Sequence, residues 1–273
     1  ALPITEDNAV DYASKNNGVM HACGHDAHTT IAIGIAKILA PKMMAGELSG
    51  TIKFIFQPAE EDIDQNGLTG SPHLIQAGVL QNVDAAIALH VNPEQPVGEV
   101  LLNEGFSMSS VDTFHAKIKG SGGHAAYPHL ATDPIWMLGN VLQAIQGIVA
   151  RKISPLEPSV ISVTHVETTP YYNVIPNEVT MQGTIRSYHP IIREQLQQEL
   201  SNVFKIVHSL GGEYELEIMN GEPVLNNHPV VIKWLENTVK DILPSFTIHK
   251  EPYGLGGEDF SHMLLQVPGA MFF

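Results

Sequence analysis

The sequence predicts an α/β fold in which a mostly parallel sheet, flanked by helices, is interrupted by an inserted α+β domain. Segments 51–56 and 83–91 are apolar and typical of strands, and segment 71–80 between them has helical spacing. Such strand–helix–strand alternation is typical of a parallel sheet covered by helices. After residue 110 the expected elements follow the order β-α-β-β-α-β of a split, ferredoxin-like sandwich.

The first elements follow from local patterns of apolar residues. Segment 29–43 repeats isoleucine and leucine at helical spacing, and Thr29 or Asp26 is a candidate for its N-cap. Segment 51–56 is typical of a strand and ends before a Gln-Pro pair. Segment 83–91 is almost continuously apolar, which is typical of a strand covered on both faces of its sheet.

The middle of the chain predicts the inserted domain. Strands are expected over 111–119, 159–168, 177–187 and 213–219, and helices over 133–150 and 190–210. Asp133 and Pro134 favour the start of the first of these helices, as a capping carboxylate followed by proline does. Two further helices are expected over 228–243 and 258–266, before a terminal strand.

These patterns divide the chain into a main domain with an insertion. We expect the main domain over residues 1–109 and 219–273 and the insertion over 110–218. Trp136 and Trp234 lie on expected helices at apolar spacing, and we expect both in the core.

Composition excludes several classes of protein. The chain has 273 residues and a net charge of −15, with 14 Lys and Arg against 29 Asp and Glu. So acidic a surface is a poor partner for nucleic acid, and no apolar run reaches the roughly 18 residues that a membrane span needs. One cysteine excludes an intrachain disulfide and favours a reducing, cytoplasmic location. The 14 histidines make metal binding a hypothesis to examine.

A dense group of potential metal ligands lies at residues 20–28, which contain one thiol, Cys23, and three imidazoles. Thiolate and neutral imidazole suit Zn²⁺ and similar ions. Gly24 lets the backbone turn so that Cys23 and His25 can face one point. The alternative is a cysteine buried as a small apolar residue beside surface histidines.

Two further segments place polar groups where strands end. Glu60 and Glu61 follow segment 51–56, and ligands of open α/β sheets gather at the carboxyl ends of strands. Adjacent carboxylates repel unless a cation or a proton lies between them, so one can ligate a metal while the other accepts a proton. We expect Asp62 and Asp64 to form a solvated turn. His90 ends the strand 83–91, and its place at the same sheet edge favours a ligand over a core histidine.

Seven short motifs occur in order along the chain: Val19–Asp26, Gln57–Glu61, Ala88–Val91, Gly122–Ala126, Asn173–Pro176, Gly183–Arg186 and Gly257–Ser261. Together they resemble the M20 metallopeptidase family, in particular its amidohydrolase branch of N-acyl-amino-acid amidohydrolases, hippurate hydrolases and auxin-conjugate hydrolases. The resemblance implies a zinc-peptidase-like catalytic domain and an inserted lid and dimerisation domain.

The resemblance also implies a dinuclear site holding two divalent ions such as Zn, Mn or Co. The ligands it implies are Cys23, His25, Glu61 and His90. Glu60 would be the general base. A fifth ligand, a histidine beyond the terminal strand, is absent from this chain, and an acidic segment of the family would precede Ala1. We therefore expect both ends of the chain to be truncated.

Four residues outside this group are candidates for contacting the substrate, three of them by the same resemblance. His124 would be an oxyanion donor, often reaching across a dimer, and Asn173 and Arg186 would hold the α-carboxylate. Glu258 follows a Gly-rich loop and would face the substrate. The alternatives are a turn histidine for His124, a surface ion pair for Arg186 and a helix cap for Glu258.

The function that the resemblance implies is hydrolysis of the amide bond of N-acyl amino acids or related carboxyl-terminal amides, by a homodimer, with a metal-activated water and Glu60 as base. A dipeptidase or carboxypeptidase of the same family is an alternative. A thiol hydrolase with Cys23 as nucleophile is a second alternative, and a catalytically silent metal-binding or dimeric scaffold is a third.

Overall fold

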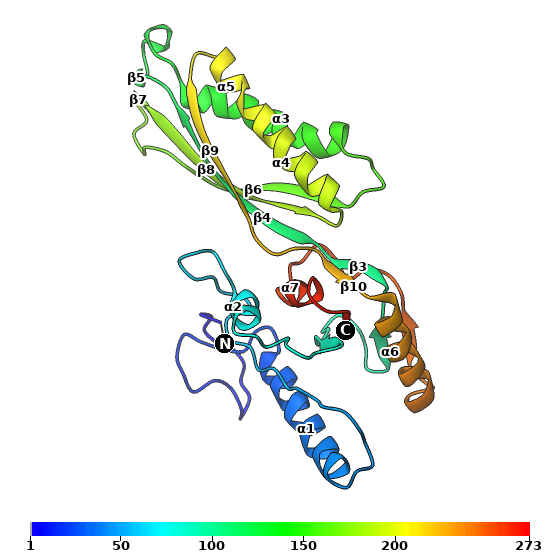
Figure 1. Ribbon diagram of the computed structural model, residues 1–273. Coiled ribbons are helices and arrows are strands. Elements are labelled where there is room, and N and C mark those ends of the chain that lie inside the picture. Colours follow the sequence, from blue (N-terminus) through cyan, green and yellow to red (C-terminus); the bar gives the residue numbers. More distant parts are fainter. Residues whose placement is uncertain (1) are drawn as a thin grey trace. The chain divides into compact units, whose positions relative to one another are not determined.

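The computed structural model describes residues 2–273, and the chain divides into two compact units that we describe separately (Figure 1). The first unit comprises the residues up to Glu104, Asn227–Glu251 and His262–Phe273. The second unit comprises Gly105–Asn226 and Pro252–Ser261. No helix within residues 2–273 is both long enough and apolar enough to cross a bilayer.

The first unit contains helices and two short parallel strand pairs. Its helices are α1 (His25–Met44), α2 (Gly70–Gln76) and α6 (Pro229–Ile242). Its strands are β1 (Ala86–Leu89), β2 (Glu99–Leu101), β11 (Thr247–His249) and β12 (Gly269–Phe272). Strand β1 pairs with β12, and β2 pairs with β11, both in parallel. A small buried apolar cluster of this unit contains Leu102, Val231, Ile232 and Ala270.

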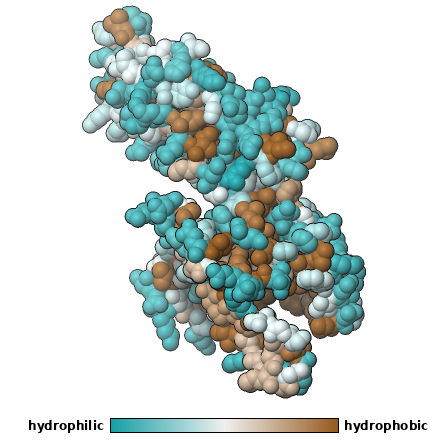
Figure 2. Space-filling model, in the orientation of Figure 1, coloured by the Kyte–Doolittle hydropathy of each residue, from teal (hydrophilic) through white to brown (hydrophobic). Residues whose placement is uncertain are grey.

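Helix α1 begins earlier than the sequence predicts. Its N-cap is Gly24, so Asp26 and Thr29 lie inside the helix and the predicted caps are wrong. The Thr29 hydroxyl donates instead to the carbonyl of His25 at 2.9 Å, one turn back. None of the side chains of α1 is buried. Ile31, Ile33, Ile35 and Ile38 of this helix are exposed. Figure 2 shows hydrophobic areas lying between hydrophilic ones on the surface of the molecule.

The mixed α/β class is confirmed, but the single, mostly parallel sheet is not found among residues 2–273. Parallel pairing links β1 with β12 and β2 with β11, each in a two-stranded sheet, and the larger four-stranded sheet is antiparallel. Segment 51–56 forms no strand in this part of the chain, and its Ile52 and Phe56 are about half exposed. The prediction failed here because β-propensity reports suitability for a pleated surface and does not provide the neighbouring strand.

The second unit is built on one four-stranded antiparallel sheet. Its strands are β4 (Ser110–Lys119), β6 (Ser159–Glu167), β8 (Glu178–Ser187) and β9 (Glu213–Asn220). They lie in the order β6-β8-β4-β9. Helices α3 (Pro134–Lys152), α4 (Pro190–Phe204) and α5 (Ile206–Ser209) cover one face of this sheet (Figure 1). The elements β4, α3, β6, β8, α4 and β9 therefore follow one another as β-α-β-β-α-β.

Smaller elements complete the chain. They are β3 (Gly105–Met108), which pairs with β10 (Leu225–Asn227), β5 (Gly123–His124), which pairs with β7 (Val174–Ile175), and the short helix η1 (Pro128–Leu130). Helix α7 (Phe260–Leu264) spans the boundary between the units.

The core of the second unit lies between the sheet and its helices. Alternate residues of β4, among them Phe114 and Ile118, are fully buried, as the period of a half-covered strand requires. Asp112 shares this face and is fully buried, where its carboxylate accepts from Arg193 of α4, whose Nε lies 3.0 Å away. Trp136 and Trp234 are 55% and 53% exposed, so their predicted place in the core is wrong. Each lies on the outer face of its helix.

Candidate metal centre

Cys23 and His25 lie on either side of a turn that requires glycine. Gly24 has φ 80° and ψ 15°, a left-handed conformation that glycine adopts without steric cost. A Cβ at this position would lie 2.5 Å from Cγ2 of Val91. The turn therefore brings the thiol and the imidazole toward one region while the backbone passes close to the segment after β1.

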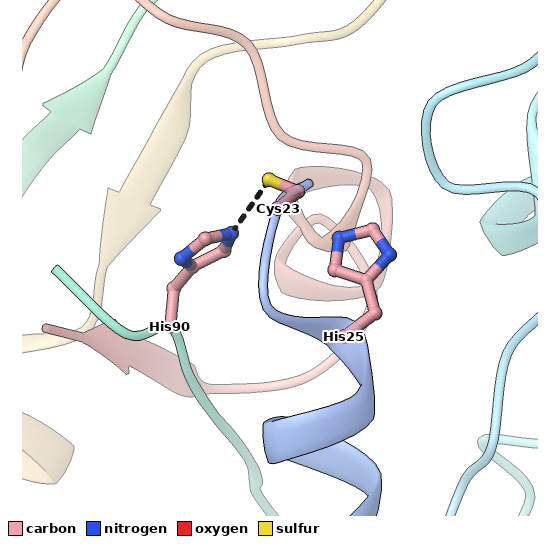
Figure 3. Close-up of side chains that lie close together, drawn as sticks. All are labelled: Cys23, His25 and His90. Atoms are coloured by element: carbon pink, nitrogen blue, oxygen red, sulfur yellow. Dashed lines mark hydrogen bonds between the residues drawn. The ribbon is translucent and has the colours of Figure 1, made fainter. Parts of the chain in front are cut away.

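His90 reaches the same region from the end of β1. Its backbone N–H donates to the carbonyl of Phe272 at 3.0 Å, which extends the pairing of β1 with β12. Its Nε2 lies 3.3 Å from Sγ of Cys23, and the three side chains group together (Figure 3). Its Nδ1 lies 2.8 Å from the carbonyl oxygen of Val91, which can only accept. The proton is therefore on Nδ1, and the lone pair of Nε2 faces the thiol.

Glu60 and Glu61 approach His25 from the loop before α2. Nε2 of His25 lies 3.5 Å from a carboxylate oxygen of Glu60 and 3.4 Å from one of Glu61. The carbonyl of Ala59 accepts from the backbone N–H of Gly70 at 2.9 Å, which fixes this loop at the start of α2. The two carboxylates thus share one imidazole, although they come from a segment that forms no strand.

The donor atoms fit divalent transition-metal ions. One ligand atom from each of Cys23, His25 and His90 lies within 4.8 Å of the others, and the same holds for His25, Glu60 and Glu61. Sulfur, imidazole nitrogen and carboxylate oxygen are the ligand types of zinc, and related divalent ions accept them too. His25 belongs to both groups, and burial lowers its pKa, with Glu61 acting in the opposite sense. Neutral imidazole is the form that binds a cation.

His28 is a member of the histidine cluster to which the sequence assigned no role. It lies on the first turn of α1, and its Nε2 accepts from the backbone N–H of Val91 at 3.0 Å. Its ring centroid lies 4.5 Å from that of His90 and 5.6 Å from that of His25. Burial, followed by His90 and His25, lowers the pKa of His28 to about 4. The spacing of three residues from His25 along one helix was the signal available in the sequence.

In the second unit, the structure brings His124 close to Asn173. Strands β5 and β7 pair His124 with Val174, and the N–H of Ala125 donates to the carbonyl of Asn173 at 3.1 Å. Nδ1 of His124 accepts from the N–H of Ala126 at 3.0 Å, and both predicted residues are exposed.

Arg186 and Glu258, the other two predicted substrate-binding residues, also lie in the second unit. Nε of Arg186 donates to the hydroxyl of Thr184 at 2.9 Å, and its Nη1 lies 3.5 Å from where a Cβ on Gly257 would be. Burial lowers the pKa of Arg186, with Asp112 acting in the opposite sense. Glu258 is buried, and its carboxylate accepts from the N–H of Phe260 at 3.0 Å, as a cap at the start of α7 does.

The structure does not bring Asn173 and Arg186 together within one chain. Strand β8 has 10 residues, which at about 3.3 Å per residue separates its ends by about 30 Å. Asn173 precedes the start of this strand, whereas Arg186 lies next to its end. One carboxylate cannot contact both side chains of the same chain.

Comparison with known proteins gives consistent matches over the whole chain. The model of peptidase family M20/M25/M40 matches residues 1–273. Thermostable carboxypeptidase 2 of Saccharolobus solfataricus is 38% identical over 278 residues, covering 100% of this chain and 68% of that protein. N-acetylcysteine deacetylase of Bacillus subtilis is 37% identical over 270 residues, covering 98% of this chain and 69% of that protein.

A solved structure has a similar fold. The Bacillus subtilis YXEP protein, described as a dinuclear metal-binding peptidase of the M20 family, superposes with a TM-score of 0.81 at 31% identity. The match covers 99% of this chain and 68% of that one.

Proposed function

This chain belongs to peptidase family M20/M25/M40, whose named relatives are hydrolases, and we propose that it hydrolyses the amide bond of N-acyl amino acids. The observation that carries the proposal is the meeting of a thiol, two imidazoles and two carboxylates from three separate segments. These side chains provide both metal-ligand atoms and a carboxylate that can accept a proton. Metal-assisted hydrolysis needs both kinds of group.

Cys23, His25, Glu61 and His90 are the residues that we propose as ligands of two divalent ions. Zinc, manganese and cobalt are the candidate metals. Metal ions bound there would lower the pKa of a water molecule and polarise the carbonyl of the scissile amide. The glycine turn at Gly24 and the pairing of β1 with β12, which bring the side chains of Cys23, His25 and His90 together, support this proposal.

Glu60 is the general base in this proposal. Its carboxylate lies beside His25 without being needed in the proposed ligand set. It would accept a proton from the attacking water and pass that proton to the nitrogen of the leaving amine. One carboxylate then acts first as base and later as acid.

The residues of the second unit would bind the substrate. Arg186 presents a half-buried guanidinium, whose planar fork suits the α-carboxylate of an amino acid. Because His124 and Asn173 lie at the opposite end of β8, we propose that these two act on a substrate held by a second copy, in a homodimer. Residues 110–218 would be the lid and dimerisation domain, inserted into a catalytic domain of residues 1–109 and 219–273. A thiolate ligand also favours a reducing compartment such as the cytoplasm.

A carboxypeptidase or dipeptidase activity is the second candidate, and the 38% identity to thermostable carboxypeptidase 2 favours it. Both reactions break an amide next to an amino acid that bears a free carboxylate. A panel of N-acetyl, N-benzoyl and indole-acyl amino acids, with matched dipeptides, separates the two by the ratio of kcat/KM.

The Glu60→Gln variant tests the proposed mechanism. We expect it to bind the same amount of metal, measured by elemental analysis, and to lose turnover by 10²–10⁴-fold. Glu47→Gln, at an exposed residue, is the matched control and should keep full turnover. Absence of bound metal in the active protein, or inactivation by a thiol alkylator that does not depend on metal, would instead support Cys23 as a nucleophile. Absence of turnover in every assay would support the scaffold alternative.

A further inference from the structure

His28 connects helix α1 to the segment that follows β1. Its Nε2 lies 3.0 Å from the backbone nitrogen of Val91, which can only donate, so this ring nitrogen is the acceptor. Its ring also packs against that of His90 at a centroid distance of 4.5 Å and an angle of 67°. His28 therefore contacts both the side chain of one proposed ligand and the peptide that follows it.

This geometry does not suit His28 as a ligand. The lone pair of its Nε2 is already directed at the N–H of Val91, and the donor groups found among residues 2–273 do not include it. A purely structural histidine would account for the burial. It would not account for ring contacts with both proposed ligands, His25 at a centroid distance of 5.6 Å and His90 at 4.5 Å.

Both backbone polar groups of Val91 are hydrogen-bonded, one in each of the two peptide units that meet at this residue. Its N–H donates to His28, and its carbonyl accepts from Nδ1 of His90 at 2.8 Å. The second bond places the proton of His90 on Nδ1 and leaves Nε2 with a lone pair toward Cys23. A shift of the Val91 backbone would therefore rotate the His90 ring or release its hydrogen bond.

Val91 also packs against the ligand turn. Its Cγ2 occupies the space that a Cβ on Gly24 would need, at a distance of 2.5 Å. The turn holding Cys23 and His25 and the strand end holding His90 thus meet at one residue. His28 is the side chain that fixes the backbone of that residue.

We propose that His28 is a positioning residue of the metal centre: it anchors the Val91 peptide and so orients His90 toward Cys23 for binding a divalent cation. This inference rests on the proposed function, because it assigns His28 a role toward the proposed ligands. Outer partners that fix a ligating histidine typically contribute 10–100-fold to metal affinity.

Cobalt(II) binding to the full chain tests the inference without a substrate. We would compare wild type with His28→Leu, which removes the acceptor, and with His28→Gln, whose amide oxygen can replace it. His21→Leu, at an exposed histidine of the same loop, is the control. The measurements are cobalt affinity in competition with a chelator, the thiolate charge-transfer and d–d bands, and the Tm of the metal-free protein.

We expect His28→Leu to weaken cobalt binding 10–100-fold and to alter the d–d bands, with an unchanged metal-free Tm. His28→Gln should restore both, and His21→Leu should match wild type. If His28→Leu fails to fold, His28→Asn replaces it, because its shorter amide should not reach Val91 and should bind more weakly than His28→Gln. Wild-type affinity in His28→Leu, or equal losses in His28→Leu and His28→Gln, would overturn the inference. Failure of wild type to bind cobalt would contradict the proposed metal centre itself.

Discussion

The two units differ in what holds each of them together. In the second unit, the sheet and helices α3, α4 and α5 share one large apolar cluster, with Phe114 and Phe204 fully buried. In the first unit, α1 has 20 residues and buries none of its side chains. Polar contacts and close backbone approaches organise the region of the proposed ligands, among them those of Gly24 and His28.

The larger apolar cluster thus lies in the second unit, whereas the proposed metal ligands lie in the first. Apolar burial supplies stability that is independent of ligands, whereas clustered imidazoles and carboxylates gain stability when a cation joins them. We therefore expect the stability of the second unit to depend on its core residues and that of the first unit to depend on bound metal.

Substitution in the core of the second unit should have the largest effect on stability. Phe114→Ala removes a fully buried ring and should lower the free energy of unfolding of this unit by about 3–5 kcal/mol, measured by urea denaturation. Ile38→Ala on α1, where the side chain is 65% exposed, is the control and should change stability by less than about 0.5 kcal/mol. If Phe114→Ala also weakened cobalt binding, the two units would not be independent.

Removal of bound metal should lower the stability of the first unit. At a free metal concentration of 100 times Kd, binding stabilises the folded state by about 2.7 kcal/mol. A chelator should therefore lower protection from hydrogen exchange in α1 and β1 while leaving that of β4 and β8 unchanged. A uniform loss of protection in both units would contradict the comparison.

Gly24→Ala should lower the free energy of unfolding more than the same change at another glycine of similar backbone conformation. Gly46 has φ 73° and open space where an added Cβ would lie, so Gly46→Ala should cost about 1 kcal/mol through backbone strain alone. Gly24→Ala adds the close contact with Val91 and should cost about 1–3 kcal/mol more, with weaker cobalt binding. Thermal unfolding measures both variants, and equal losses would argue against the close approach.

We expect the smallest change in the free energy of unfolding for substitution of Glu236 on α6. Hydrogen bonds from Lys240 and Lys250 lower the pKa of this carboxylate to about 2. Because the pKa is depressed by folding, the stabilisation is present above the ordinary pKa of a glutamate and is lost as the pH falls toward 2. Glu236→Gln should lower the free energy of unfolding by about 0.5–1 kcal/mol at pH 6 and by less at pH 2, where about half of the carboxylates are protonated, as measured by urea denaturation. Glu94→Gln, at an exposed turn, is the control, and an equal loss at both pH values would refute the prediction.

The sequence predicted the second unit best because local patterns suffice there. Strand β4 alternates buried and outward residues as the sequence does, and Asp133 caps α3 through bonds to the N–H groups of Ile135 and Trp136. Each of these features depends on neighbours within a few residues.

The first unit was predicted less well because its contacts are long-range. Segment 51–56 has the composition of a strand, but a strand also needs a partner that composition does not reveal. His28 was visible as a histidine, yet its bond to Val91 depends on how β1 lies against α1. Cys23, His25 and His90 were expected together because strand ends converge, and their ligand roles stay predictions.

The pairing of β1 with β12 has a consequence for how the molecule assembles. The N–H of His90 bonds to Phe272, so the strand end that carries this imidazole is completed by residues far along the chain. During synthesis, the loop of Cys23 and the carboxylates at 60–61 leave the ribosome long before that partner. Contacts of such high sequence separation form late, since the intervening chain must be ordered first. Most of the proposed donor atoms are therefore synthesised before the strand that completes the end of β1, and we expect their final grouping to form late in folding.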